Sequence, residues 1–259
     1  EIAAAARPAP RAGGVTDAEV LTALQQLEAG AGAGEAVNGI NNLKSITWLE
    51  TAVRVSRSVC RVLVTSAKGS GYGSGFLIAP DRVMTNNHVI GSKKDARAAR
   101  IEFNYRLALG GVGDPTVRYE LDPAAFFHTS PEDELDYTVV AVRPTPGQPP
   151  PEAWGVLTLN ADAVPVPRDL VPVIQHPNAQ VQQVALTSSV VVRVKPPYLH
   201  YTTDTMPGSS GSPVFNDLWQ VVAIHHAAGP VVGKVETNEG VLMSAIRPHL
   251  GAHWPAPPG

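Results

Sequence analysis

The sequence predicts an all-β protein with a short helical segment at each end. Short apolar runs rich in Val and Ile recur along the chain, and Pro or Gly separates most of them. The 259 residues include 24 Pro and 23 Gly, and 44% of residues are hydrophobic against 17% charged. This composition is typical of many short strands joined by turns around a sizeable core.

The N-terminal region, residues 1–54, is expected to be a linker followed by a helical extension. Residues 1–14 are rich in Ala, Pro and Gly, as in linkers. A capping box begins at Thr16 and opens a predicted amphipathic helix that runs to Gly30. The stretch 45–58 is expected to be a helix or an extended lead-in to the strands.

The strands are predicted from apolar runs bounded by turn residues. The Pro-rich stretch 144–152 suits a crossing between two strand groups, and residues 244–253 are expected to form a C-terminal helix that Pro248 disturbs or breaks. The predicted strands are 59–65, 74–79, 82–85, 100–104, 117–121, 137–143, 155–159, 170–175, 182–187, 190–195, 213–216, 220–226 and 241–243.

The most informative motif is Gly-Ser-Ser-Gly-Ser-Pro at 208–213. A serine hydroxyl is a poor nucleophile at neutral pH, so it needs a neighbouring imidazole and donors for the oxyanion. Flanking glycines suit a sharp turn in which the N–H groups of Gly208 and Ser210 converge as an oxyanion hole. Taken alone, the hexapeptide also fits an ordinary turn between strands.

Two further segments supply the other residues of a catalytic triad. His88 lies in Thr-Asn-Asn-His-Val at the end of a predicted strand pair. Asp136 precedes an apolar strand, where a carboxylate is expected to be partly buried and bonded to an imidazole. Asp133 competes with it but lies in an acidic run typical of a solvated loop. His88 would accept the Ser210 proton, and Asp136 would fix the tautomer of the imidazole.

The order His, Asp, Ser separates families of hydrolases. α/β-Hydrolases have the order Ser, Asp, His and subtilisins Asp, His, Ser, whereas the chymotrypsin class has the order of this chain. From about residue 55 to 250 the sequence therefore resembles the trypsin-like, chymotrypsin-fold serine peptidases, bacterial type. The His motif is similar to that of the high-temperature-requirement proteases, and the Ser motif to that of the glutamyl endopeptidases.

The resemblance implies two antiparallel six-stranded β-barrels, about 55–145 and about 152–245, within a peptidase domain at 55–259. Two such barrels need about 200 residues. It also implies a serine endopeptidase that works through an acyl-enzyme. A catalytically silent barrel that serves as a binding module is the alternative. Ser209 stands where digestive trypsins carry the Asp that receives a new N-terminus, so regulation is expected through the N-terminal extension or a partner.

The resemblance leaves two cleavage preferences open. Asp204 lies at the offset from Ser210 where trypsins carry the Asp that selects Lys or Arg. Thr205 and His225 match positions that bind a substrate Glu in glutamyl endopeptidases. An Asp near the pocket repels a carboxylate, so cleavage after a basic residue is favoured. Cleavage after Glu is the alternative.

No cofactor and no metal site are expected. The neighbouring His225 and His226 would face opposite sides of a strand and could not share one ion. The single cysteine, Cys60, excludes an internal disulfide and fits a reducing compartment.

The expected partners are a protein or peptide substrate and a regulatory protein bound through the N-terminal extension. A net charge of −3 gives no electrostatic case for nucleic acid or an anionic membrane. Residues 1–30 lack the basic start and apolar core of a signal peptide. A cytoplasmic location is therefore expected, with a secreted protein whose leader has been removed as the alternative.

Overall fold

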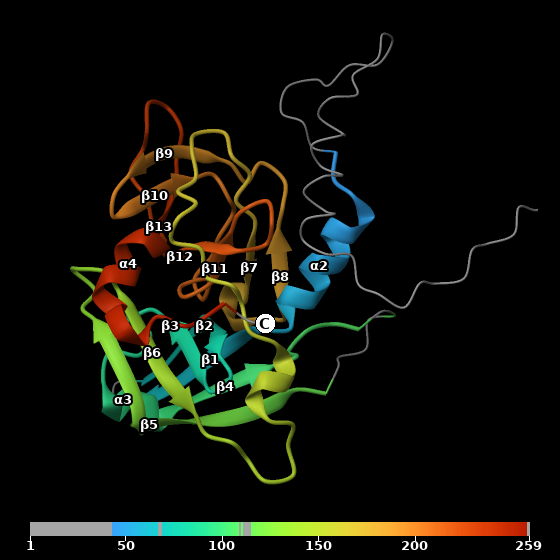
Figure 1. The fold of residues 1–259 in the computed structure, drawn as a ribbon, viewed down its shortest axis with the longest axis vertical. Helices are drawn as coiled ribbons and strands as arrows, with labels where there is room; N and C mark the ends of the chain where they lie inside the picture. Colours follow the sequence, from blue (N-terminus) through green and yellow to red (C-terminus); the bar gives the residue numbers. More distant parts are fainter. Residues whose placement is uncertain (1–42, 67–68, 109, 111–114, 258–259) are drawn as a thin grey trace, which may run out of the picture. The chain divides into compact units, whose positions relative to one another are not determined.

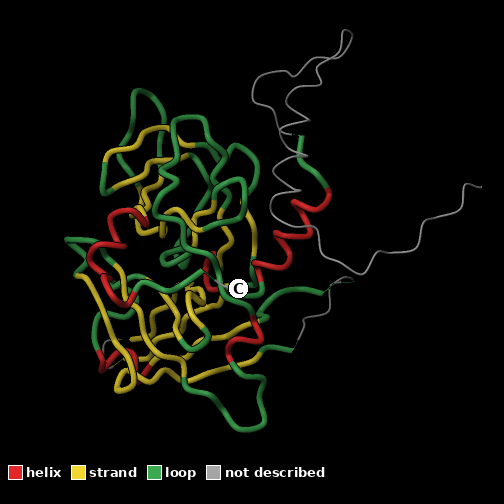
Figure 2. Tube along the Cα trace, viewed as in Figure 1, coloured by secondary structure: helices red, strands yellow, loops and turns green. Residues whose placement is uncertain are grey.

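The computed structural model describes residues 43–66, 69–108, 110 and 115–257. The chain divides into two units, Glu1–Leu43 and Lys44–Gly259. The helix predicted over 16–30 lies outside the described residues. In the second unit the chain is mostly β, with few and short helices (Figures 1 and 2). None of the helices in the described part has the length and hydrophobicity needed to cross a bilayer.

The described chain begins with helix α2 (Ile46–Ser56), so the stretch 45–58 is helical rather than extended. Ser45 caps the helix by accepting from the backbone N–H of Trp48 at 3.2 Å. Trp48 Nε1 donates to the carbonyl of Asp217, and Trp219 Nε1 donates to the carbonyl of Trp48. These paired indoles fix the helix to the second sheet.

The first sheet is a closed six-stranded barrel with the order β1-β2-β3-β6-β5-β4. Apolar side chains on alternate positions of its strands fill the interior, among them Val62, Leu77 and Ile101. Its strands are β1 (Val59–Ser66), β2 (Gly69–Ala79), β3 (Arg82–Thr85), β4 (Ala99–Phe103), β5 (Val117–Ser130) and β6 (Tyr137–Val142).

Two features of the first barrel differ from the prediction. Helix α3 (Lys93–Ala98) was not predicted, because this short segment has no apolar periodicity and is recognisable only by its cap, Ser92. Strand β5 was expected to end at residue 121 but runs to Ser130. Its pairing with β6 shifts register between Asp122 and Phe127, so the strand bulges around Pro123 and continues.

The second sheet has seven strands in the order β8-β7-β11-β12-β13-β10-β9. The two-barrel fold class is confirmed, although this half is a seven-stranded sheet rather than the closed six-stranded barrel expected. The strands are β7 (Val173–Gln175), β8 (Gln183–Ala185), β9 (Val191–Lys195), β10 (Tyr198–Tyr201), β11 (Pro213–Phe215), β12 (Val221–Ala228) and β13 (Asn238–Leu242).

The prediction of a strand at 155–159 is wrong, and β10 was not predicted from the sequence. Gly155 has a φ of 85°, and Leu159 makes only an isolated bridge to Val221. Strand β10 begins directly after Pro196-Pro197, which conceals a strand start in the sequence. The short 3₁₀ turn η2 (Pro177–Ala179) joins β7 to β8.

The connection between the sheets and the C-terminal helix complete the core. In the connection, the 3₁₀ turn η1 (Pro151–Trp154) places Trp154 on Phe103, with ring centroids 5.6 Å apart. Helix α4 (Met243–Leu250) is followed by the 3₁₀ turn η3 (Gly251–His253). Pro248 lies inside α4 without breaking it, since the buried side chains of the helix pack into a core shared by both sheets.

Candidate active site

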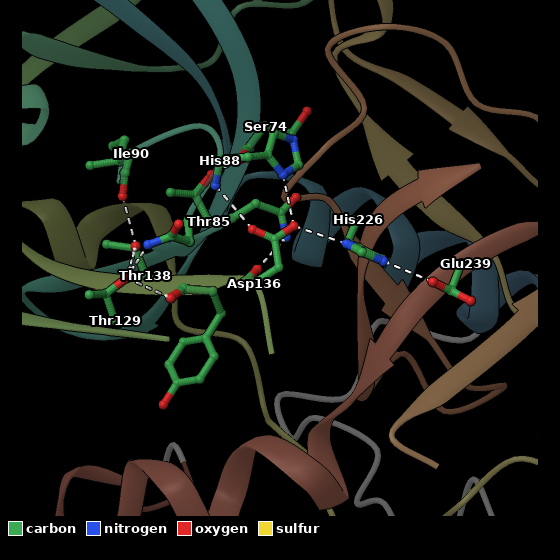
Figure 3. A network of polar contacts seen from close by, with 12 residues as sticks. Ser74, Thr85, His88, Ile90, Thr129, Asp136, Thr138, His226 and Glu239 are labelled. Carbon is green, nitrogen blue, oxygen red and sulfur yellow. Dashed lines mark hydrogen bonds and ion pairs between the residues drawn. The ribbon is translucent and has the colours of Figure 1, made fainter. Parts of the chain in front are cut away.

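Two of the predicted catalytic residues are in direct contact. His88 lies in the turn after β3, and its ring Nδ1 is 2.7 Å from Asp136 Oδ2. The backbone N–H of His88 donates to Asp136 Oδ1 at 3.0 Å, so one carboxylate holds both parts of the histidine (Figure 3). Because an ionised carboxylate only accepts, Nδ1 carries the hydrogen and Nε2 is left as an acceptor. Such an imidazole is arranged to take a proton from a nucleophile.

Asp136 is fully buried immediately before β6. Its backbone adopts a left-handed conformation with a φ of 40°, which Asp tolerates better than most residues. Its backbone N–H donates to the carbonyl of Pro131, and the side chain of Asn86 donates to its carbonyl. The competing Asp133 is exposed in the preceding loop. The structure therefore places Asp136, and not Asp133, against His88.

A second histidine contacts the same carboxylate. His226 Nδ1 is 3.0 Å from Asp136 Oδ2, and His226 Nε2 is 2.9 Å from Glu239 Oε1 (Figure 3). Burial opposes the ionisation of Asp136, but hydrogen bonds from His226 and His88 outweigh it and lower the pKa of the carboxyl group. Asp136 is therefore an anion shared by two imidazoles.

Ser210 lies in a loop of the second sheet that is anchored on the first barrel. Its carbonyl accepts from the backbone N–H of Ser74 in β2 at 2.8 Å, and Ser74 Oγ donates to the carbonyl of Gly208 at 2.9 Å. A Cβ added at Gly73 would meet both the Ser210 carbonyl and Val89, which follows the histidine in sequence. The loop thus brings the serine to the histidine end of the barrel. Within the described residues no hydrogen bond joins the two side chains.

The backbone around Ser210 leaves two N–H groups free. Gly208 has a φ of 95° and Gly211 a φ of 86°, a region that favours glycine. The carbonyl of Pro207 accepts from the backbone N–H of Asn178 at 2.6 Å, so the N–H of Gly208 points to the other side of that planar peptide. In the described part of the chain, neither the Gly208 nor the Ser210 N–H donates to another group. Both are available to an oxyanion.

Replacement of Gly211 by alanine is expected to disrupt this loop. The added Cβ would overlap the carbonyl oxygen of Ser74 and the hydroxyl of Thr85. We expect a loss of about 3 kcal/mol or more in the free energy of unfolding. Thermal unfolding measures it. Gly147→Ala is the matched control, because Gly147 also has a positive φ, 80°, but open space around it. Equal stability of the two variants would contradict the steric argument.

A comparison with models of protein families matches residues 73–224 to the trypsin-like peptidase domain. The matched segment covers more than half of the chain and contains the histidine, aspartate and serine described above. The chain belongs to the trypsin-like peptidase domain family. The family predicted from the three motifs and their order is confirmed.

Two curated proteins are similar in sequence to this peptidase domain. Uncharacterized protein y4fB of Sinorhizobium fredii is 37% identical over 250 residues, which are 89% of this chain and 38% of that protein. Secreted RxLR effector protein 73 of Plasmopara viticola is 29% identical over 224 residues, which are 76% of this chain and 52% of that protein. The chain thus spans about two fifths to one half of the length of these relatives.

Solved proteases share the fold. The active form of the Rv3671c protease from M. tuberculosis has a TM-score of 0.57 at 17% identity, covering 87% of this chain and 97% of that one. The serine endoprotease from Yersinia pestis has a TM-score of 0.56 at 17% identity, covering 78% and 64%. At these identities the likeness establishes the fold, in agreement with the barrel and sheet described above.

The residues predicted to line the specificity pocket of the peptidase differ in exposure. Asp204 is exposed, and its carbonyl accepts from Gln175 Nε2 at 2.9 Å. Thr205 is half-buried. His225 is buried, with Nδ1 2.8 Å from the hydroxyl of Tyr201. Within the described residues the carboxylate of Asp204 makes no hydrogen bond to either histidine of β12.

Two buried histidines should make the fold sensitive to acid. Burial lowers the pKa of His225 to about 3 and that of His176 to about 4. Since both bind a proton more readily when unfolded, their contribution to stability is complete above pH 6.5 and is lost as the pH falls. We expect each of the two histidines to lower the free energy of unfolding by roughly 1 kcal/mol per pH unit as the pH falls from 6.5 to 4. The contribution of His226 to stability depends on pH in the opposite direction. Burial lowers its pKa, but hydrogen bonds to its two carboxylate partners outweigh burial and raise it.

Thermal unfolding of the chain at pH 7 and pH 5 measures this dependence. The melting temperature should be lower at pH 5. His253→Asn serves as the control, because His253 is exposed and its replacement should leave the dependence unchanged. A melting temperature that is constant or higher at pH 5 would show that the buried histidines do not govern acid stability.

Sequence reasoning missed Ser74, the pairing of His226 with Asp136, and Glu239. Ser74 Oγ bridges the two sheets, since it accepts from the backbone N–H of His176 and donates to the carbonyl of Gly208. No sequence signal identifies such a bridge, because the contact joins residues far apart in the chain. His226 carried a weak signal, as a polar residue in an apolar strand.

The remaining histidines and the cysteine are further candidates for a metal site or a nucleophile. Among the described residues no group of three or more His, Cys, Asp or Glu side chains is placed to hold a metal ion. His225 and His226 contact different partners, Tyr201 and Asp136. Cys60 is buried in β1, and burial raises the pKa of its thiol, which disfavours the reactive thiolate.

Proposed function

We propose that the chain is a serine endopeptidase in which His88, Asp136 and Ser210 form the catalytic triad. The observation that supports this most strongly is the double hydrogen bond of Asp136 to the backbone and ring of His88. The loop of residues 207–212, here called the nucleophile loop, contains Ser210 and is held on β2 by Ser74. It supplies the serine and two free backbone N–H groups for the oxyanion.

In the proposed reaction, His88 Nε2 takes the proton of the Ser210 hydroxyl as its oxygen attacks the scissile carbonyl. The N–H groups of Gly208 and Ser210 stabilise the oxyanion, and Asp136 stabilises the imidazolium that forms. The imidazolium then gives the proton to the amine as the scissile C–N bond breaks. The acyl group stays bound to Ser210 as an acyl-enzyme. Water activated by His88 hydrolyses the acyl-enzyme by the same steps in reverse order.

Cleavage of a mixed peptide library near neutral pH tests this proposal, with product ends located by mass spectrometry. The full chain should cut peptides at internal bonds, and the Ser210→Ala chain should not. Cleavage that persists in the Ser210→Ala chain, or a folded wild-type chain that cuts no peptide, would contradict the proposal.

We propose that the peptidase prefers to cleave the bond that follows a basic residue. The position of Asp204 supports this preference. Its exposed carboxylate lies in the segment that leads into the nucleophile loop. His225, the rival receptor for a substrate Glu, has its Nδ1 at the Tyr201 hydroxyl, and burial with a pKa of about 3 keeps its ring uncharged near neutral pH. A neutral, buried imidazole is a poor partner for a carboxylate.

The Asp204→Ser variant is expected to lose about 10²-fold in kcat/KM for substrates with Lys or Arg before the cut bond. The reason is that the variant leaves the substrate cation without a partner. Peptide pairs that differ only in this residue provide the measurement. Asp81→Ser removes another exposed carboxylate and should change nothing. Unchanged Lys or Arg cleavage in Asp204→Ser, or cuts after Glu in the wild type, would reject this preference.

The regulatory partner expected at the N-terminal extension stays a prediction. Most of residues 1–54 lies outside the described part of the chain, and only α2 and the residues next to it are described. The trypsin-like peptidase domain supports a protein or peptide substrate.

A further inference from the structure

The polar network at Asp136 extends beyond the triad into the second sheet. His226 and Glu239 are shielded from solvent, with side chains 13% and 17% exposed. The second oxygen of Glu239 accepts from His200 Nε2 at 2.7 Å, and His200 Nδ1 accepts from Arg193 Nε at 3.4 Å. The network thus joins four strands, and the proposed reaction requires none of its members beyond Asp136.

A β-bulge directs His226 toward Asp136. His225 and Ala227 pair with consecutive residues of β13, so His226 is the extra residue in the register shift of β12. A bulge re-aims a side chain and is frequent beside active sites. The ring of Tyr198 stacks on His226, with centroids 5.8 Å apart and planes 11° apart, which fixes the plane of the imidazole.

The contacts of His226 define its protonation state. Its Nδ1 faces a carboxylate oxygen of Asp136, and its Nε2 faces a carboxylate oxygen of Glu239. Ionised carboxylates only accept, so both ring nitrogens carry hydrogen and the ring is an imidazolium. Burial opposes this charge, but the hydrogen bonds and charges of the two carboxylates outweigh burial and raise the pKa of His226.

We propose that His226, held by Glu239, is a positioning residue of the peptidase. As an imidazolium between two carboxylates it fixes the orientation of Asp136 and offsets part of the negative charge that acts on His88. This inference rests on the proposed roles of His88 and Asp136.

The charge of His226 has a definite effect on the general base. A positive charge next to Asp136 disfavours a second positive charge on His88. The titratable groups in contact with His226 are Asp136 from the first barrel, Glu239 on β13 and Tyr198 on β10. His88 contacts Asp136, His200 on β10 contacts Glu239, and His225 precedes His226 on β12.

Two substitutions separate orientation from charge. His226→Asn places an amide N–H where the ring Nδ1 lies, so it keeps a donor to Asp136 without the charge. We expect the acidic limb of its kcat/KM profile to move up by about one pH unit, with kcat little changed. His226→Ala removes both donor and charge, and we expect the same shift with a roughly ten-fold loss of kcat at unchanged KM. His253→Asn is the control. Wild-type pH profiles in both His226 variants would overturn the proposal.

A measurement without substrate keeps the inference testable if the His226 variants fold poorly. NMR of the histidine side-chain nitrogens in the full Ser210→Ala chain should show both His226 nitrogens protonated at neutral pH. The titration of His226 should move to lower pH in Glu239→Gln, while that of His253 stays in place. A neutral His226 at pH 7 would overturn the proposal, and so would a titration of His226 that is the same in Glu239→Gln as in the parent chain.

The two experiments also separate this inference from the proposed function. If the wild-type chain cleaves peptides but both His226 variants keep its pH profile, the positioning role fails and the peptidase function stands. If NMR finds the imidazolium but the chain cleaves nothing, the function fails, and the role in positioning a working triad fails with it.

Discussion

Replacement of Ser210 by alanine is expected to lower kcat about 10⁶-fold, because loss of the nucleophile removes the covalent pathway and leaves only binding and the oxyanion hole. Folding should be unaffected, since the hydrogen bonds that place this residue use its backbone carbonyl and not its hydroxyl. The measurement is kcat for the best peptide from the library, with thermal unfolding to verify the fold.

Ser70→Ala provides the matched control for Ser210→Ala. Ser70 is an exposed serine on β2, in the same barrel strand as Ser74 but distant in sequence from the nucleophile loop. Its replacement should leave kcat within two-fold of the wild type. A Ser210→Ala chain that keeps more than about one hundredth of the wild-type kcat would mean that another group is the nucleophile.

Asp136→Asn is expected to lower kcat about 10⁴-fold near neutral pH, as the equivalent change does in the Ser-His-Asp template. An amide that donates toward His88 favours the wrong tautomer of the imidazole, so Nε2 no longer accepts the serine proton. In this chain the change also leaves His226 with a single carboxylate partner, Glu239. Steady-state kinetics against pH provides the measurement.

Asp133→Asn tests the assignment of the aspartate. Asp133 is exposed in the loop before Asp136, so its neutralisation should leave kcat unchanged. If Asp136→Asn lost less than ten-fold in kcat, or if Asp133→Asn lost as much, the carboxylate of the triad would have been assigned wrongly.

The fold was predictable where local pattern and tertiary structure agree. Apolar runs bounded by turns located most strands of the first barrel, because these strands carry buried apolar side chains, and β6 is buried along its whole length. Prediction failed where tertiary contacts decide. Strand β5 continues past Pro123 because β6 pairs with it on both sides of a bulge. Gly155 and the Pro196-Pro197 pair interrupt the pattern in the second sheet, where short strands depend on their neighbours.

The candidate site was predictable to the extent that chemistry requires particular residue types. A nucleophilic serine between glycines, a histidine after a strand and an aspartate before a strand are rare in combination and in that order. The supporting contacts were not predictable. Ser74 bridges two sheets, and Glu239 reaches Asp136 only through His226, so both depend on how distant strands pack. The residues of the specificity pocket were the least predictable part, since their distance from Ser210 along the sequence does not determine the direction of a side chain.

Labelling with a fluorophosphonate, which phosphonylates activated serines, tests the central claim most directly. The account predicts one adduct in the wild-type chain, located on Ser210 by peptide mass spectrometry. It also predicts that the adduct is absent from Ser210→Ala and almost absent from His88→Ala, because the serine needs the imidazole to become nucleophilic. An adduct on another residue, equal labelling of His88→Ala, or no adduct in the folded wild-type chain would contradict a triad of His88, Asp136 and Ser210.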